Sequence, residues 1–210
     1  MSEHHPSEDQ IFFLEEQEIA IEDFDASGFI LDIGGGGEGI IGMLKGQQVV
    51  AIDFRREELE EAAPGPLKIV MDARELSFLD GTFDTATAFF ALMYVRARAD
   101  CQRVFAEVFR VLRPGGRFMI WDAVIPRRLD PVKEIVAFSI TVKLRDQVIS
   151  TGYGTRWPVE EKDPGYYVRL AEGKGFVVCT EWQKERLWFL ELQKPPGRAK
   201  GRGETECDQE

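Results

Sequence analysis

Histidine and cysteine are scarce in this sequence of 210 residues. The two histidines, His4 and His5, lie at the very start, so a histidine general base is not expected. The three cysteines, Cys101, Cys179 and Cys207, are widely spaced and odd in number. They match neither a disulfide framework nor a zinc site. We therefore expect no metal site and a reducing, cytoplasmic environment.

Long apolar runs are also missing. No stretch of about 18 or more apolar residues occurs, which excludes a helical membrane span by sequence criteria. The first residues do not combine a basic segment with an apolar one, as a secretory signal does. This pattern again favours the cytoplasm and no membrane partner.

Basic residues are missing from one part of the chain only. The net charge is −11, and residues 1–25 hold nine acids and no lysine or arginine. Residues 26–193 carry 22 basic and 24 acidic residues, and residues 194–210 carry four of each. We interpret these three parts as an acidic arm, a nearly neutral domain and a disordered tail. Without a basic stripe, a nucleic-acid partner is unlikely.

Apolar segments and helical segments alternate through the first two thirds of the domain. Gly and Pro residues separate them, as in a doubly wound α/β sheet with parallel strands. The expected strands are 29–33, 49–52, 67–70, 83–90 and 117–121, and the expected helices are 39–44, 55–62 and 100–112, with Asp100 as the cap of the last.

The last third has a different pattern. Residues 135–144 and 147–151 predict a hairpin within an insertion at about 124–162. Asp163-Pro164 is a typical helix start. Residues 176–182 and 187–192 predict a terminal hairpin. For residues 11–25 a strand pair and a short helix both remain open.

The most informative stretch is a glycine-rich turn that follows a strand, Ile30-Leu-Asp-Ile-Gly-Gly-Gly-Gly-Glu-Gly-Ile40. Such a turn lets the backbone approach a ligand closely. Asp53 and Asp72 follow the next two strands. Because the carboxyl ends of parallel strands share one edge, three acids are expected around one nucleotide-like ligand.

The acid at Asp32 indicates which ligand this is. A carboxylate so close to the loop would repel a pyrophosphate, whereas it suits an ammonium or sulfonium group. Asp53 is placed to accept both hydrogen bonds of a ribose diol, and Asp72 with Ala73 could meet an adenine edge. The plainer alternatives are a sharp turn and ordinary loop acids.

The run Ile30-Leu-Asp-Ile-Gly-Gly-Gly-Gly resembles the first motif of the class I S-adenosylmethionine-dependent methyltransferases. Four further segments fit the family in order and spacing, over roughly residues 28–123. They are Val49-Val-Ala-Ile-Asp53, Met71-Asp72-Ala73, Phe83-Asp-Thr-Ala-Thr-Ala-Phe-Phe90 and Val111-Leu-Arg-Pro-Gly-Gly-Arg-Phe118. One departure is Glu38, which stands where many members have a third glycine, and which could touch the cofactor's amino group.

The resemblance implies a Rossmann-like sheet of seven strands in the order 3-2-1-4-5-7-6, with strand seven antiparallel. It also implies a cofactor-binding set, with the methionine part near Asp32 and the glycines and the ribose near Asp53. The full set is Asp32, Gly34, Gly35, Gly36, Asp53, Phe54, Asp72, Ala73 and Phe89.

Methyl transfer from a sulfonium is an in-line displacement that depends mostly on positioning. Tyr94 and Asp122 are the candidate catalytic groups. Phe90, Tyr153 and Trp157 are candidates for acceptor contacts. Residues 151–157 could form a loop that closes over a ligand, or a packed hairpin. The apolar alternation of Phe138, Ile140, Val142 and Leu144 could instead form a dimer edge.

The sequence thus predicts an S-adenosylmethionine-dependent methyltransferase that acts on a small-molecule or protein acceptor. A non-catalytic module that binds S-adenosylmethionine or S-adenosylhomocysteine is the main alternative. An NAD-dependent oxidoreductase is a weaker one, because no Tyr/Lys or His pair for hydride chemistry is found. The residues do not name the acceptor.

Overall fold

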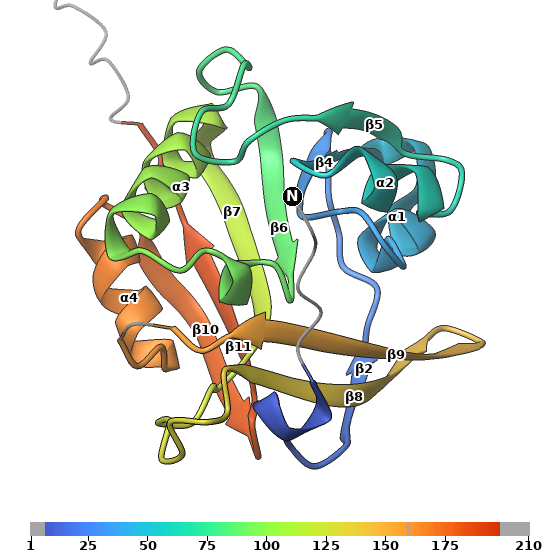
Figure 1. Ribbon diagram of the computed structural model, residues 1–210. Helices are drawn as coiled ribbons and strands as arrows, with labels where there is room; N and C mark the ends of the chain where they lie inside the picture. Colours follow the sequence, from blue (N-terminus) through green and yellow to red (C-terminus); the bar gives the residue numbers. More distant parts are fainter. Residues whose placement is uncertain (1–6, 159, 198–210) are drawn as a thin grey trace, which may run out of the picture.

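The computed structural model describes residues 7–158 and 160–197. Its main sheet has seven strands in the order β10-β11-β7-β6-β3-β4-β5 (Figure 1). These strands are β3 (Ile30–Ile33), β4 (Val49–Asp53), β5 (Leu67–Val70), β6 (Phe83–Phe89), β7 (Leu112–Ala123), β10 (Val177–Lys184) and β11 (Leu187–Gln193).

Five neighbouring strands of this sheet, β5 to β7, run parallel to one another. β11 is antiparallel to both of its neighbours, β7 and β10. Counted along the chain, the strands from the β5 edge onward are the third, second, first, fourth, fifth, seventh and sixth of this sheet. The doubly wound α/β fold predicted from the sequence is therefore confirmed.

Four α-helices accompany the described strands: α1 (Ile40–Lys45), α2 (Arg56–Glu61), α3 (Arg98–Val111) and α4 (Pro164–Glu172). The buried side chains of α3 and α4 share one cluster with one face of the main sheet. Short 3-10 turns occupy Glu8–Gln10, Gly46–Gln48 and Leu92–Tyr94.

The start of α4 follows the prediction, whereas that of α3 does not. The Asp163 carboxylate accepts a hydrogen bond from the Tyr166 amide at 2.6 Å, and Pro164 takes the first helical position. The prediction of Asp100 as a cap is wrong, because α3 already begins at Arg98. Asp100 lies in the first turn of α3 and pairs with Arg74 at 3.1 Å.

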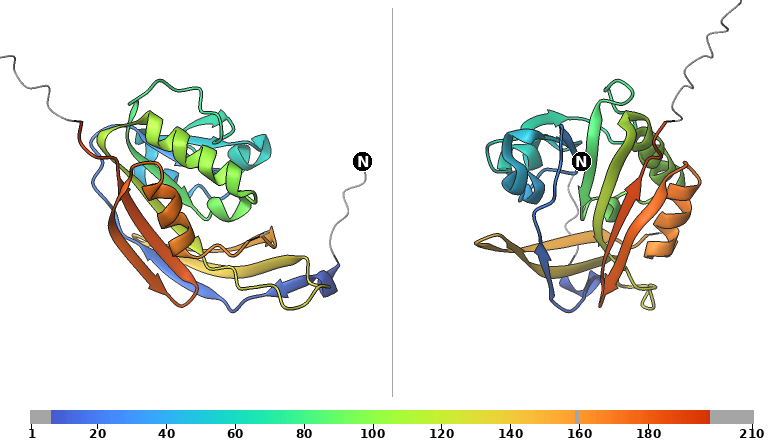
Figure 2. Two further views of the ribbon diagram at one scale, coloured as in Figure 1. Left: turned by 90° about the vertical axis from the view of Figure 1, so that its left-hand side faces the viewer. Right: turned by 180° about the vertical axis from the view of Figure 1, so that it is seen from behind.

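The acidic arm and the insertion form a second sheet. It contains β1 (Ile11–Phe13), β2 (Gln17–Ile21), β8 (Ile135–Leu144) and β9 (Gln147–Arg156). β9 pairs with one edge of β8, and β1 and β2 pair with the other edge, parallel to it. Of the two alternatives for the arm, strands are therefore correct. This sheet is a separate layer across the carboxyl end of β6 (Figures 1 and 2).

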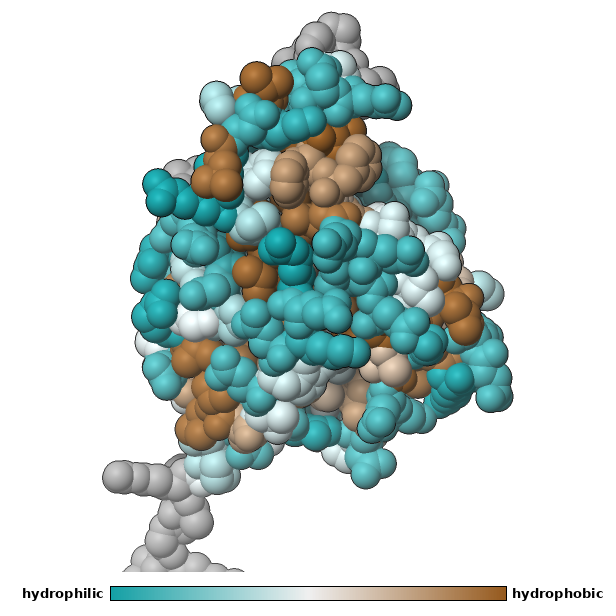
Figure 3. Space-filling view, turned by 90° about the horizontal axis from the view of Figure 1, so that it is seen from below, coloured by the Kyte–Doolittle hydropathy of each residue, from teal (hydrophilic) through white to brown (hydrophobic). Residues whose placement is uncertain are grey.

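The apolar face of β8 packs inside the protein. Val136, Phe138, Ile140, Val142 and Leu144 are buried in the same cluster as α1, Phe89 and Trp121. The interpretation of this alternation as a dimer edge is wrong, because both edges of β8 are already paired within the chain. Figure 3 views this end of the molecule and shows a largely hydrophilic face with scattered apolar spots.

Residues 151–157 do not form a closing loop either. Up to Arg156 they continue β9, and each of them faces a residue of β8 in an unbroken antiparallel register. The repeated glycines that indicated a loop, Gly152 and Gly154, lie opposite Ser139 and Ala137 in that register. The second sheet is therefore an ordered layer that packs on the main body.

The predicted tail begins in the described part of the chain. Lys194 donates to the carbonyl oxygens of Phe109 and Leu112, each at 2.7 Å, and its backbone bonds to residues of β7. Lys194 is thus anchored to the main body, and the tail from 194 stays a prediction, since residues 198–210 lie outside the described range. In the ranges that the structure covers, no helix has the length and apolar character to cross a bilayer.

The shared core predicts that the two faces of β8 respond differently to mutation. Ile140→Ala removes buried methyl groups and should lower the free energy of unfolding by about 2–5 kcal/mol. Thr141→Ala, on the opposite face, should change it by less than about 0.5 kcal/mol. Urea unfolding of both variants would measure this. Equal effects would mean that the second sheet does not share the core.

Candidate functional site

The loop between β3 and α1, residues 34–39, lies against β4 and α2. The amides of Gly34 and Gly35 both donate to the Ile52 carbonyl, at 2.9 and 3.0 Å, and the Gly37 amide donates to the Glu58 carbonyl at 2.8 Å. Gly34 and Gly37 have φ angles of 69° and 60°, which only glycine adopts without strain. The glycine content thus follows from the path of the backbone.

Two further glycines let the loop backbone touch acids. A Cβ on Gly35 would lie 2.6 Å from Oδ2 of Asp32, and a Cβ on Gly36 would lie 3.1 Å from Oδ2 of Asp53. The same Cβ on Gly36 would also lie 2.5 Å from Cβ of Glu58. Glycine backbone and two carboxylates therefore converge at one edge of the sheet.

Asp32 is almost fully buried, with 2% of its surface exposed. Burial raises the pKa of Asp32 to about 7, opposed by the hydrogen bond from Thr87 and reinforced by the charge of Asp53. The Thr87 hydroxyl donates to Oδ1 of Asp32 at 2.7 Å. Asp32 is thus an acid whose ionised form a neighbouring cation would stabilise.

Asp53 and Asp72 lie at the ends of the next two strands, as expected, but in different surroundings. Oδ1 of Asp53 accepts from the Arg55 amide at 2.9 Å. Asp72 is held by the Arg74 guanidinium, whose Nε and Nη2 lie 2.9 and 2.6 Å from its Oδ2. This pairing lowers the pKa of Asp72. An adenine amino group would have to share Asp72 with Arg74.

Phe54 and Ala73 follow these acids. Phe54 is 71% exposed, which leaves a large apolar side chain at the surface of this edge. Ala73 is half-buried and packs on the cluster under α3. Both remain candidate cofactor contacts.

Glu38, the departure from the family motif, joins the glycine loop to the second sheet. Its carboxylate accepts a hydrogen bond from the Thr151 hydroxyl and lies 3.4 Å from the Tyr153 hydroxyl. Burial and the charge of Glu38 raise the pKa of Tyr153, so Tyr153 stays protonated and donates. The insertion thus reaches the loop through β9.

An aromatic cluster lies next to this contact. The ring of Tyr153 stacks on Phe90, with centroids 4.8 Å apart and planes 13° apart. Phe90 follows β6 with a φ of 49°, and Phe89 packs edge-on against it at 4.8 Å. The structure therefore brings together Phe89, Phe90 and Tyr153.

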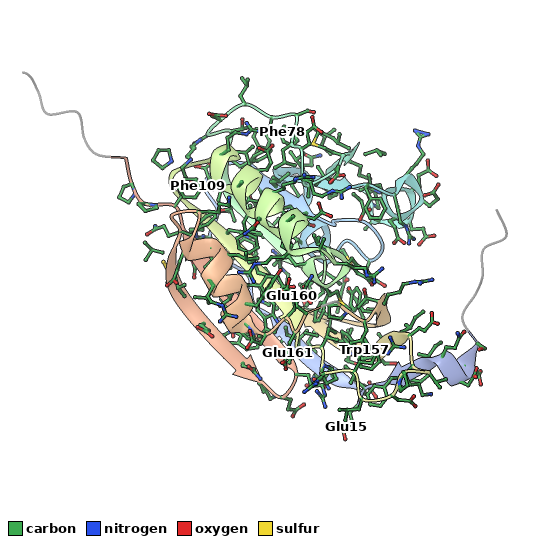
Figure 4. All side chains as sticks on the ribbon, turned by 60° about the vertical axis from the view of Figure 1, so that its left-hand side comes forward. Glu15, Phe78, Phe109, Trp157, Glu160 and Glu161 are labelled. Atoms are coloured by element: carbon green, nitrogen blue, oxygen red, sulfur yellow. The ribbon has the colours of Figure 1, made fainter. Side chains whose placement is uncertain are left out.

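Trp157 is buried in the same apolar core as Phe89 and Phe90, but its polar and ring partners are different. Its indole Nε1 donates to the Pro126 carbonyl at 2.6 Å, and its ring lies 5.6 Å from Phe12. Figure 4 shows Trp157 at the second sheet, far from Phe78 and Phe109. These contacts tie Trp157 to the second sheet, and its assignment as an acceptor contact stays a prediction.

Tyr94 and Asp122 lie close to each other but differ in exposure. Tyr94 is 44% exposed, and partial burial raises its pKa, opposed by a hydrogen bond from the Gly154 backbone. Asp122 is 1% exposed, and burial raises its pKa to about 7. Its Oδ2 accepts from the Met93 amide at 3.0 Å and its Oδ1 from the Ala123 amide at 2.8 Å.

Sequence reasoning did not single out Thr87, Arg74, Thr151 or Lys162. Thr87 lies directly opposite Asp32 in the β3–β6 register, so only the strand pairing reveals it. Arg74, two residues after Asp72, was the most accessible from the sequence, since a basic residue there can pair locally. A cavity of about 490 Å³ lies elsewhere, where β6 and β7 begin, lined by Ser27, Asp84 and Arg113 among others.

The buried acid predicts a pH-dependent effect of Asp32→Asn. Because the pKa of Asp32 is near 7 in the folded protein and near 4 when unfolded, the unfolded chain loses this proton first as pH rises. As pH rises through that range, Asp32 lowers the free energy of unfolding by up to about 4 kcal/mol. Asp32→Asn should therefore be more stabilising at pH 8 than at pH 5 in urea unfolding.

The control for this experiment is Glu57→Gln, an exposed acid of α2. It should show the same small effect at both pH values. A stability difference between Asp32→Asn and the wild type that does not vary with pH would contradict the raised pKa.

Comparison with known proteins adds independent information. Residues 31–120 match a family model described as a methyltransferase domain. A ubiquinone/menaquinone biosynthesis C-methyltransferase of Desulfotalea psychrophila is 41% identical over 39% of this chain and 34% of its own length. A phosphatidylethanolamine N-methyltransferase of Cereibacter sphaeroides is 42% identical over 34% of this chain and 38% of its own. The chain thus spans little more than a third of these two relatives.

Solved structures share more of the fold. An S-adenosylmethionine-dependent methyltransferase of Methanosarcina mazei superposes with a TM-score of 0.59 and 20% identity, covering 82% of this chain and 95% of that one. One from Mesorhizobium loti gives 0.57 and 18%, covering 81% and 93%. The methyltransferase-domain match over residues 31–120 and the fold shared with these structures are consistent with a class I S-adenosylmethionine-dependent methyltransferase.

Proposed function

We propose that this protein transfers a methyl group from S-adenosylmethionine to a small-molecule acceptor bound between the glycine-loop edge and the second sheet. The observation that carries this proposal is the contact of these two parts. Glu38 bonds to Thr151, and Phe90 stacks on Tyr153, so that β9 faces the residues assigned to the cofactor.

The residues at this edge fit the cofactor. S-Adenosylmethionine carries an ammonium and a sulfonium charge, and Asp32 is a buried acid whose pKa a neighbouring cation would lower. Gly35 and Gly36 let the loop backbone pack closely against Asp32, Asp53 and Glu58, which brings the loop and the acids to the edge where the cofactor would lie. Asp53 would hold the ribose diol, and Asp72 with Ala73 would contact the adenine.

A small acceptor is favoured by the closed form of the site. The second sheet packs on the carboxyl edge through a shared apolar core, which leaves less room there for a folded protein partner. Two relatives bear the names of a quinone-biosynthesis C-methyltransferase and a phosphatidylethanolamine N-methyltransferase. Those names describe the relatives, and they support a non-protein acceptor here.

The bound cofactor supplies an electrophilic methyl group, and the protein positions the acceptor. Phe90 and Tyr153 offer an aromatic wall at the end of β6. Tyr94, whose raised pKa keeps it protonated at neutral pH, offers a hydrogen-bond donor. Excluding water from this region strengthens such interactions.

The pKa of Asp32 predicts how cofactor affinity depends on pH. Below pH 7 the cofactor must displace a proton from Asp32, so its affinity should rise with pH, by up to about tenfold per unit, and level off above pH 7. Titration calorimetry in buffers of different ionisation enthalpy would detect the released proton. Asp32→Asn should bind weakly with no such slope. A flat profile for the wild type would exclude Asp32 as the cofactor's counter-charge.

The methyltransferase activity itself is tested by S-adenosylhomocysteine release. We expect release with the low-molecular-mass fraction of a cell extract and not with its protein fraction. Asp53→Ala should lose most of it through weaker cofactor binding. Binding of S-adenosylmethionine and S-adenosylhomocysteine without turnover on any fraction would instead support the non-catalytic module, and binding of NAD alone would support the oxidoreductase.

A further inference from the structure

The short turn that carries Tyr94, residues 91–95, is held by polar groups from several other segments. We call it the Tyr94 turn. Within it the Tyr94 amide donates to the Ala91 carbonyl at 3.3 Å and the Val95 amide to the Leu92 carbonyl at 3.1 Å. With these two local bonds, the geometry of the turn depends largely on bonds from other segments.

A buried acid holds this turn from β7. Oδ2 of Asp122 accepts from the Met93 amide at 3.0 Å, and Oδ1 accepts from the amide of Ala123. Both carboxylate oxygens are therefore bonded to backbone. A general base would need an oxygen directed at the acceptor, and the geometry instead assigns Asp122 to the turn.

A buried base holds the same turn from the segment before α4. Lys162 is 2% exposed, and its Nζ donates to the Val95 carbonyl and lies 3.6 Å from Sγ of Cys101. Its charge lowers the pKa of Asp122, against the larger effect of burial. Glu160, two residues before it, pairs at 3.3 Å with Arg98 of α3 and lies between α3 and the second sheet (Figure 4).

β9 and α4 contact two further carbonyl groups of the turn. The hydroxyl of Thr155 lies 3.5 Å from the Met93 carbonyl, and that of Tyr167 lies 3.4 Å from the Leu92 carbonyl. The side chains of Leu92 and Met93 are buried. Tyr94 is the residue of the 3-10 segment that points its side chain outward.

Burying a carboxylate and an ammonium is costly, and it is tolerated where a particular geometry requires it. Here two buried side chains bond to one backbone turn, Asp122 at the Met93 amide and Lys162 at the Val95 carbonyl. This arrangement leaves the Tyr94 side chain partly exposed next to β9, the strand that faces the cofactor edge.

We propose that Asp122 and Lys162 are positioning residues that fix the Tyr94 turn, so that the Tyr94 hydroxyl meets the acceptor in one orientation. Asp122 acts through the turn and takes no proton from the acceptor. This inference rests on the proposed placement of the acceptor.

A double-mutant cycle tests the positioning role. Tyr94→Phe and Asp122→Asn should each lower kcat/KM for the acceptor on the order of 10–100-fold, with the cofactor Kd unchanged. The double variant should be no worse than Tyr94→Phe by more than about twofold, since Asp122 acts through Tyr94. If Asp122→Asn lowers kcat by the same factor in both backgrounds, Asp122 acts independently and the inference is wrong.

A second measurement needs no acceptor. Hydrogen exchange of the Met93, Tyr94 and Val95 amides should accelerate in Asp122→Asn and in Lys162→Met, and stay at the wild-type rate in Tyr94→Phe. The matched control is Lys194→Met, because Lys194 also donates to two backbone carbonyls but lies at the far end of β7. Cofactor binding shows that each variant is folded.

The two measurements separate this inference from the proposed function. Unchanged hydrogen exchange in both Asp122→Asn and Lys162→Met would overturn the inference even if methyl transfer is found. Faster exchange in these two variants, without turnover on any acceptor, would support the role of Asp122 and Lys162 in fixing the Tyr94 turn, while the proposed function fails.

Discussion

The contact between the apolar face of β8 and the carboxyl end of the main sheet determines the form of the site. Without it, the glycine loop and the ends of β3, β4 and β6 would form an open edge, as strand ends do in an open α/β sheet. With it, Val136 and Val142 share a core with α1 and Trp121. Every contact of β9 with Glu38, Phe90 or Tyr94 follows from that packing.

Closing this edge buries charged groups, and the protein accommodates them in different ways. Among the described residues, Thr87 is the side chain that donates to Asp32, and the pKa of Asp32 near 7 suits an acid whose charge a bound cation would stabilise. Asp122 has a similar pKa but two backbone amides on its oxygens. Both acids are thus buried, but Asp32 can still bind a ligand, whereas both oxygens of Asp122 are bonded to the backbone.

The comparison of sequence and structure separates local from long-range information. The motif from Ile30 to Ile40 and the acid at Asp53 were recognisable because strand-end chemistry is local. Asp163 as a cap also followed from two adjacent residues, and the structure agrees. Three interpretations failed: Asp100 as a cap, residues 151–157 as a loop, and β8 as a dimer edge. The loop and dimer-edge interpretations depended on strand pairing along β8, which a short segment by itself does not reveal.

The sequence by itself determined the α/β class, the glycine loop and the order of the three acids, because periodicity, turn chemistry and spacing are properties of short segments. Only the tertiary structure decided that the acidic arm pairs with the insertion, that Thr87 faces Asp32, and that Asp122 and Lys162 act on one turn. Strand pairing and burial join residues that are distant in the chain. A side chain's pKa and its free hydrogen-bonding capacity follow from those neighbours, so composition and spacing could not give them.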